Sequence, residues 1–341
     1  MKLTKYENNP ILSANPENDW ESLCVLNPAV WYEPAEDTFY MLYRAAGNDA
    51  THYIHLGLAT SKDGFHFERR SDQPFLSPDI NGPDGGCIED PRLTKMGDTY
   101  YIVYAARTYA PGQYWSADWK PLGDRDVEGV HFVQANNAVS HLAVTKDFRT
   151  VKRLGRISDS RFDDRDVILF PERVNGQYVR LSRPVERVGQ EYGCTVPSIF
   201  ISFSDDLMEW GEPQLLMTAE EWWQDKKMGG SCPPIKTPKG WLHLFHGVAS
   251  RDDGYRVGAA LLDLDNPAKV IGRTADFIME PEFDYETSGY YNGCVFPTGN
   301  AVKGDTLYVY YGAADKFVCA ATCRLSELLD FIVSNTRRGD R

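Results

Sequence analysis

Gly304-Asp305-Thr306-Leu307-Tyr308-Val309-Tyr310-Tyr311 is a tight polar turn followed by a strand of alternating apolar and aromatic residues. Gly next to Asp or Asn suits the positive φ values of hairpin turns, and Tyr and Val favour strands. The pattern occurs four more times, at intervals of about 60 to 80 residues, as DTFYMLY (37–43), GDTYYIVY (97–104), NGQYVRL (175–181) and KGWLHLF (239–245). This interval is too long for a short solenoid repeat and fits a four-stranded propeller blade with its loops.

The rest of the chain follows the same rhythm. Each copy is followed by a second apolar stretch, and several of these continue into an Asp-containing turn, as at 61–64. Helical periodicity is confined to 219–226 and to the tail. No segment is rich enough in Gly, Ser or Pro to act as a linker between domains. The sequence therefore predicts one all-β domain over 1–341, a five-bladed β-propeller with an inserted loop at about 110–136 and a short C-terminal helix at about 326–334.

Composition excludes several classes of partner. The net charge is −13 without any run of Lys or Arg, which argues against nucleic acid and anionic membrane surfaces. The N-terminus lacks the apolar core of a signal peptide, and no stretch approaches the roughly 20 apolar residues of a membrane span. Seven scattered cysteines do not indicate a disulfide framework. We therefore expect a cytoplasmic protein with reduced thiols, no metal site and no organic cofactor.

Charged residues gather at the ends of the predicted strands. Glu89-Asp90-Pro91-Arg92 directly precedes the repeat at 97–104, interpreted as the inner strand of the second blade, and Pro91 biases Asp90 to an extended conformation at the strand mouth. In a propeller such positions converge near one end of the axis. Other charged or polar strings stand at strand entries, Asp164-Arg165-Asp166 and Lys227-Met228-Gly229-Gly230, and at strand exits, Tyr43-Arg44, Ser182-Arg183-Pro184, Phe245-His246-Gly247 and Gly312-Ala313-Ala314-Asp315.

One carboxylate among several cations predicts a particular chemistry. An inverting displacement at a sugar needs an acid on one face and a nucleophile on the other. A hydrolase uses a second carboxylate to deprotonate water, whereas phosphate is already anionic and needs only positioning and charge neutralisation. Arg forks and a Lys point charge suit such an anion. The inventory therefore favours phosphorolysis over hydrolysis.

An ordered set of short motifs resembles glycoside hydrolase family 130, which contains β-mannoside phosphorylases and some β-mannosidases on a five-bladed propeller. The resemblance runs from about Asn9 to Leu329. The motifs are NPAV (27–30), LYR (42–44), EDPR (89–92), LFPE (169–172), KMGG (227–230), GWLHLFHG (240–247), YRVGAALLD (255–263), VFPTG (295–299) and YYGAAD (310–315).

The resemblance implies a role for individual residues. Asp90 matches the general acid, which acts through the mannose 3-hydroxyl to protonate the glycosidic oxygen. Asn27 and Asp315 match positions that contact the mannosyl unit. Six further residues match positions that bind the phosphate co-substrate: Arg44, Arg165, Arg183, Lys227, His246 and Tyr255. The implied reaction is inverting phosphorolysis of a β-mannoside (a manno-oligosaccharide, or mannosyl-glucose or mannosyl-GlcNAc) to α-mannose 1-phosphate and a shortened acceptor sugar, without a metal.

Several alternatives stay open at this point. An inverting β-mannosidase would need a second carboxylate, for which Glu172 and Glu280 are candidates, and a glycan-binding propeller would need no acid. The cations could instead form ion pairs across blades. In the insertion, Trp115 and Trp119 could line the acceptor side or fold onto a neighbouring blade. The acceptor sugar, its linkage and assembly into a homo-oligomer are not fixed by the sequence.

Overall fold

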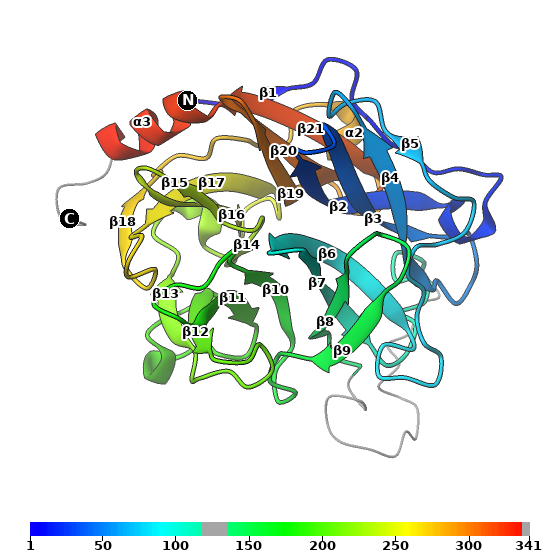
Figure 1. Ribbon diagram of the computed structural model, residues 1–341, viewed down its shortest axis with the longest axis horizontal. Coiled ribbons are helices and arrows are strands. Elements are labelled where there is room, and N and C mark those ends of the chain that lie inside the picture. The colour runs from blue at the N-terminus through cyan, green and yellow to red at the C-terminus, as the bar shows by residue number, and fades with distance from the viewer. Residues whose placement is uncertain (118–135, 336–341) are drawn as a thin grey trace.

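The computed structural model describes residues 1–117 and 136–335, and within them the chain is all-β, as predicted (Figure 1). The strands pair as successive antiparallel meanders. The first two are joined into one sheet by a parallel contact between Ile54 and Cys87. They contain β2 (Cys24–Glu33), β3 (Thr38–Ala46), β4 (Ile54–Ser61) and β5 (Glu68–Arg69), then β6 (Cys87–Met96), β7 (Thr99–Arg107), β8 (Val139–Thr145) and β9 (Lys152–Arg156).

Three further meanders follow along the chain. In Figure 1, β2, β6, β10, β14 and β19 lie toward the centre of the view, and the later strands of each meander lie nearer the rim. These meanders contain β10 (Asp164–Leu169), β11 (Tyr178–Pro184), β12 (Ile199–Ser204) and β13 (Gln214–Met217); β14 (Lys227–Gly230), β15 (Ile235–Thr237), β16 (Gly240–Val248), β17 (Tyr255–Leu262) and β18 (Val270–Arg273); and β19 (Val295–Lys303), β20 (Thr306–Ala313) and β21 (Phe317–Arg324).

Helices are few and short in the described residues. Helix α3 covers the segment for which a C-terminal helix was expected, whereas the periodic stretch at 219–226 forms only a single 3-10 turn. None of the helices within 1–117 and 136–335 has the length and apolar character needed to cross a membrane. They are η1 (Asp19–Glu21), η3 (Gln190–Tyr192), η4 (Trp222–Gln224), α2 (Asp284–Thr287) and α3 (Leu325–Asn335).

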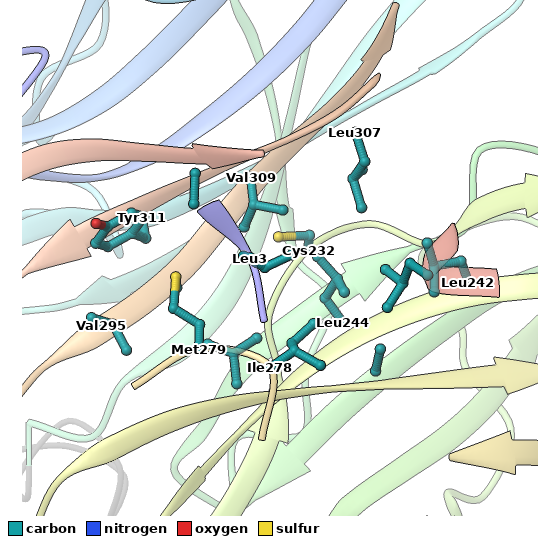
Figure 2. Packing of buried hydrophobic residues seen from close by; sticks show 14 of the residues in the cluster. Leu3, Cys232, Leu242, Leu244, Ile278, Met279, Val295, Leu307, Val309 and Tyr311 are labelled. Carbon is teal, nitrogen blue, oxygen red and sulfur yellow. The ribbon is translucent and has the colours of Figure 1, made fainter. Parts of the chain in front are cut away.

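The N-terminal strand completes the last meander. Strand β1 (Thr4–Lys5) pairs with β21, so the two ends of the chain share one sheet. Lys5 Nζ donates to Glu286 Oε2 at 2.8 Å, and both side chains are almost fully buried. Leu3, next to β1, packs among buried side chains of β16, β17 and β20, including Leu244 and Val309 (Figure 2). The N-terminus is therefore part of a hydrophobic core.

The five repeats form the second strand of each meander, with hairpin turns at their starts. Asp37, Gly97, Gly176 and Gly304 have φ values of 45°, 63°, 83° and 63°, as the turn composition predicted. The expectation that residues 97–104 form the inner strand was wrong. Strand β6, which contains Asp90, precedes β7 and is the first strand of its meander. Pro91 interrupts the hydrogen bonding at a bulge inside β6 and does not mark the start of a strand.

Candidate active site

Three polar residues lie at bulges in the strands that begin the first three meanders. Asn27, Asp90 and Asp166 have φ values of 44°, 53° and 58°, and the pairing of β2, β6 and β10 shifts register at these points. Positive φ is uncommon for residues other than glycine, and bulges re-aim side chains beside active sites. Pro28 and Pro91 follow the first two residues and have no N–H to contribute to a ladder. Three neighbouring meanders therefore each place a polar residue with positive φ at a bulge in their first strand.

Asp90 is held at one carboxylate oxygen. Asn27 Nδ2 donates to Oδ1 at 2.6 Å, and Arg44 Nη1 donates to the same atom at 2.9 Å. Arg92 Nη1 donates to the Asp90 carbonyl at 2.7 Å, which fixes the backbone of the bulge. Within the described residues, Oδ2 accepts no hydrogen bond. The geometry leaves this oxygen available to a substrate hydroxyl.

Glu89 balances the charge beside the candidate acid. Its carboxylate lies 3.0 Å from Arg44 Nη1 and 3.3 Å from Arg107 Nε, and the residue is buried. Burial raises its pKa, but the charges of Arg44 and Arg107 outweigh this effect and lower it. Arg44 therefore bridges Glu89 and Asp90. Arg44, which is part of β3, thus forms the ion pairs that were considered as the alternative to its predicted role, with two acidic residues of the next meander, while its phosphate contact stays a prediction.

A second group of side chains comes from the third and fourth meanders. Arg183 Nε donates to Asp166 Oδ2 at 2.6 Å, and Lys227 Nζ donates to the Tyr255 hydroxyl oxygen at 2.7 Å. The His246 ring stacks on the Tyr255 ring, with centroids 5.5 Å apart. The structure thus brings together four of the six residues predicted to bind phosphate. We call Arg183, Lys227, His246 and Tyr255 the cationic cluster.

Glycine permits this close packing. A Cβ atom at Gly229 would lie 2.4 Å from Asp166 Oδ2, 2.7 Å from His246 Cε1 and 2.9 Å from Arg183 Nε. Real Cβ atoms do not approach other heavy atoms so closely, so the KMGG motif supplies a residue without one. The glycine lets β14 approach the third meander.

The protonation states differ within the cationic cluster. Burial and the neighbouring charge of Arg183 lower the pKa of Lys227 to about 8. Burial also lowers the pKa of His246 to about 3, so its ring is neutral at pH 7. Its Nδ1 lies 3.3 Å from Ser231 Oγ. The cluster therefore offers a permanently charged guanidinium, an ammonium whose pKa is lowered to about 8, and neutral hydrogen-bond donors.

Asp315 is influenced by both parts of the site. It has a φ of 54° in the turn between β20 and β21, and its pKa is raised to about 6. Burial is the largest cause; Arg44 and Lys227 oppose it, and Asp90 adds to it. The carboxyl group that the sequence assigned to the mannosyl unit therefore responds electrostatically to the candidate acid and to the cationic cluster.

Arg165 stands at the edge of the site. Both its Nε and its Nη2 donate to the Asp163 carboxylate at 2.7 Å, and about a third of its side chain is exposed. The charges of Glu89 and Asp166 also act on it, after that of Asp163. Its guanidinium is thus held by a carboxylate two residues earlier, and phosphate binding by Arg165 stays a prediction.

The described part of the insertion packs on the neighbouring meanders. The Trp115 ring lies 4.7 Å from the rings of His52 and Tyr290, measured between centroids, and Tyr114 packs against its edge. Burial raises the pKa of Tyr114, and the charges of Asp315 and Arg44 also act on this phenol. Trp115 is therefore part of an aromatic cluster at the side of the site. Trp119 lies outside the described residues.

The two carboxylates considered for a hydrolase are engaged elsewhere. Glu172 forms an exposed ion pair with Lys236, and Glu280 forms ion pairs with Lys2 and Arg256. Neither contacts the cationic cluster. Across residues 1–117 and 136–335, no three His, Cys, Asp or Glu side chains are grouped as a metal site would require.

Sequence reasoning missed three members of the site. Asp166, Glu89 and Arg92 were seen only as parts of charged strings, and no role was predicted for them. Each is buried and bound to a predicted site residue or to its backbone. These charged residues stand beside apolar residues of predicted strands, which indicates that they are buried. Because a buried charge must be paired, this position could have predicted that they contact other charged residues of the site.

The sequence matches a known family along most of its length. Glycoside hydrolase family 130, described as beta-1,4-mannooligosaccharide phosphorylase, matches residues 2–125 and 130–334. A 1,2-beta-oligomannan phosphorylase of Thermoanaerobacter sp. (strain X514) is 36% identical over 334 residues, which is 96% of this chain and 99% of that protein. A beta-1,4-mannooligosaccharide phosphorylase of Ruminococcus albus is 29% identical, over 97% and 91% of the two chains.

A solved structure has the same overall arrangement. It is the complex of the beta-1,2-mannobiose phosphorylase from Listeria innocua with beta-1,2-mannobiose. It superposes with a TM-score of 0.79 at 27% sequence identity, covering 98% of this chain and all of that chain. The similarity in sequence and structure extends through both parts of the candidate site.

Proposed function

The chain belongs to glycoside hydrolase family 130, and from this membership and the geometry of the site we propose that it is an inverting β-mannoside phosphorylase. The enzyme transfers a mannosyl unit from a β-mannoside to inorganic phosphate. The products are α-mannose 1-phosphate and a shortened acceptor sugar. Phosphate is a co-substrate, and neither a metal nor an organic cofactor takes part.

One observation carries the proposal. Among the described residues, Asp90 Oδ2 accepts no hydrogen bond, whereas the cationic cluster contains no carboxylate of its own. The carboxylate beside the cluster, Asp166, is bound to Arg183. Asp315, whose pKa responds to both parts of the site, we assign to the mannosyl unit. With these roles the cluster supplies no base to deprotonate water, whereas an anionic nucleophile needs none.

The reaction follows from these groups. Arg183 and Lys227 neutralise phosphate and orient one of its oxygens toward the anomeric carbon, and Tyr255 and His246 complete the pocket. As this oxygen forms its bond to the carbon, the bond to the glycosidic oxygen breaks. Asp90 gives its proton to the mannose 3-hydroxyl, which passes one on to the leaving oxygen. Attack from the opposite face converts the β-linkage to the α-phosphate.

We propose a β-1,2-linked manno-oligosaccharide as the substrate. The relatives that are 34 to 36% identical carry names that specify β-1,2-linked mannosides. The relatives that are 29% and 27% identical are named for β-1,4-linked mannosides or for 4-O-mannosyl-glucose. The greater similarity to the first group supports this choice of linkage.

We also propose that the five meanders are the blades of a five-bladed propeller, with the site at one end of its axis. The repeated bulges and the pairing of β1 with β21 support this interpretation. All seven cysteines are free thiols, which supports a cytoplasmic location. A homo-oligomer is compatible with the proposal and is not required by it.

The synthetic direction gives a direct test. The protein is incubated with α-mannose 1-phosphate and a panel of acceptors: mannose, glucose, N-acetylglucosamine and β-1,2-mannobiose. Phosphate release accompanied by a β-1,2-linked product is the expected result. A product with a β-1,4 linkage would refute the choice of linkage only. If no acceptor releases phosphate but mannosides still bind to the Asp90→Asn variant as to the unaltered protein, the protein is a glycan-binding module.

A further inference from the structure

The carboxylate of Asp166 lies between two guanidinium groups and the neutral ring of His246. Its Oδ2 lies 2.6 Å from Arg183 Nε and 3.7 Å from His246 Nε2, and its Oδ1 lies 3.6 Å from Arg92 Nη2. Only 3% of the side chain is exposed. Because solvent reaches almost none of this side chain and Arg183 is bound to Oδ2, Asp166 lacks the access that a general base needs.

Arg92 links Asp166 to the other half of the site. Its Nη1 donates to the Asp90 carbonyl at 2.7 Å, its Nε donates to the Ser231 carbonyl at 2.5 Å, and its guanidinium lies over the Phe296 ring at 5.4 Å. Arg92 thus ties β6 to β19 and to the residue that follows β14. Asp166 lies against this arginine and against the cationic cluster.

We propose that Asp166 is a positioning residue, which holds Arg183 and His246 in the arrangement that binds phosphate. This inference rests on the proposed function and adds to it a residue that does not itself contact the sugar. Before phosphate enters, the positive charges of Arg183, Lys227 and Arg92 lie close together and repel one another. The carboxylate offsets this repulsion, and its bond to Nε leaves the Nη atoms of Arg183 directed away from it toward an incoming anion.

The test is the Asp166→Asn variant, which keeps the size of the side chain and removes its charge. We expect KM for phosphate to rise about tenfold or more, the size of effect that follows loss of a partner orienting a direct contact. KM for the mannoside at saturating phosphate stays within about twofold, because the Asp90 contacts do not involve this carboxylate. Equal increases in both KM values would overturn the inference.

Asp164→Asn is the matched control. Asp164 is buried on the same strand and accepts the backbone N–H of Arg183 at 3.1 Å, but its carboxylate forms no ion pair with a side chain of the cationic cluster. An amide can accept the same bond, so KM for phosphate should remain unchanged. If the control raises this KM as much as Asp166→Asn does, the effect is structural and the inference is wrong.

The pH dependence of kcat/KM for phosphate distinguishes an electrostatic role of Asp166 from a purely structural one. Lys227 is faced by Arg183, Arg165, Asp166, Cys294 and Tyr255; the two arginines disfavour its charged form, and Asp166 favours it. Removing the charge of Asp166 therefore moves the alkaline limb of kcat/KM for phosphate to lower pH. An unmoved limb contradicts the proposed contact between this charge and the site.

Gly229→Ala provides a second route that retains the charge. The added Cβ would lie 2.4 Å from Asp166 Oδ2 and 2.7 Å from His246 Cε1, so the carboxylate must shift. The same Cβ would lie 2.9 Å from Arg183 Nε, so the variant disturbs the pair of Asp166 and Arg183 together. We expect KM for phosphate to rise and KM for the mannoside to stay level, and the variant keeps the inference open to refutation if Asp166→Asn does not fold. An unchanged phosphate KM in Gly229→Ala overturns the inference. If the unaltered protein turns over without phosphate, the proposed function fails, and the inference fails with it.

Discussion

The side-chain amide of Asn27 donates to Asp90 Oδ1 at 2.6 Å, across neighbouring meanders and between two bulges of the same kind. Both residues have positive φ and both precede a proline. A Cβ atom on Gly312, which is part of β20, would lie 1.9 Å from Asn27 Oδ1. The position of the candidate acid therefore depends on a glycine from a third meander.

The Gly312→Ala variant tests this dependence. The new methyl group cannot coexist with Asn27 as placed, so the amide shifts and Asp90 loses one of its two anchors. We expect kcat to fall about a hundredfold, since misplacing a reacting group by about 1 Å has that effect. Gly211→Ala, whose Cβ would lie 3.4 Å from its nearest neighbour, is the control and should retain activity. A fully active Gly312→Ala enzyme would show that Asn27 does not position the acid.

Asp90→Asn separates catalysis from binding. The amide oxygen can still accept from both Asn27 and Arg44, but the amide cannot act as the acid, so kcat for phosphorolysis should fall about a thousandfold. Mannoside binding, measured by calorimetry, should change little. Activity within a few-fold of the unaltered protein would mean that a different group is the acid.

The charge of Lys227 predicts a pH dependence. Burial and Arg183 lower the pKa of the amine to about 8, so the ammonium that attracts phosphate is lost as pH rises through this value. We expect kcat/KM for phosphate to fall above about pH 8 while KM for the mannoside stays level. In Lys227→Arg the guanidinium remains charged, so the remaining activity should lack this limb. A flat profile from about pH 7 to about pH 9.5 would contradict this role of Lys227.

The N-terminal strand predicts a stability effect. Lys5 is paired with Glu286, which is buried and also accepts from the Tyr311 hydroxyl at 2.8 Å. Lys5→Ala leaves that buried carboxylate without its cation and should lower the free energy of unfolding by about 3 kcal/mol. Lys146→Ala, which removes the exposed pair with Asp98, should leave it nearly unchanged. Urea unfolding measures both, and equal midpoints would show that β1 does not lock the last sheet.

The sequence predicted the all-β class because turn chemistry and alternation are local signals. The positive φ at Asp37 and Gly304 and the strands after them follow directly from those residues. The inner strands were harder to predict. β6 contains two consecutive charged residues followed by a Pro, a composition that is typical of a loop. The strand accommodates these residues at a bulge, which the sequence does not predict.

The candidate site was predictable only in part. Resemblance to the family assigned roles to Asp90, Lys227 and His246, because these residues lie in recognisable motifs, and the roles themselves stay predictions. It did not identify Asp166 or Arg92, since their importance lies in contacts with distant strands. No local pattern encodes a carboxylate of β10 that meets a guanidinium of β6, because that contact exists only once the meanders pack together.

The requirement for phosphate tests the central claim most directly. The protein is incubated with β-1,2-mannobiose, with and without inorganic phosphate, and the products are separated and their anomeric form is determined. We predict α-mannose 1-phosphate and mannose in equal amounts when phosphate is present, and no turnover without it. Release of mannose alone, at the same rate in the absence of phosphate, would contradict the account and make the protein a β-mannosidase.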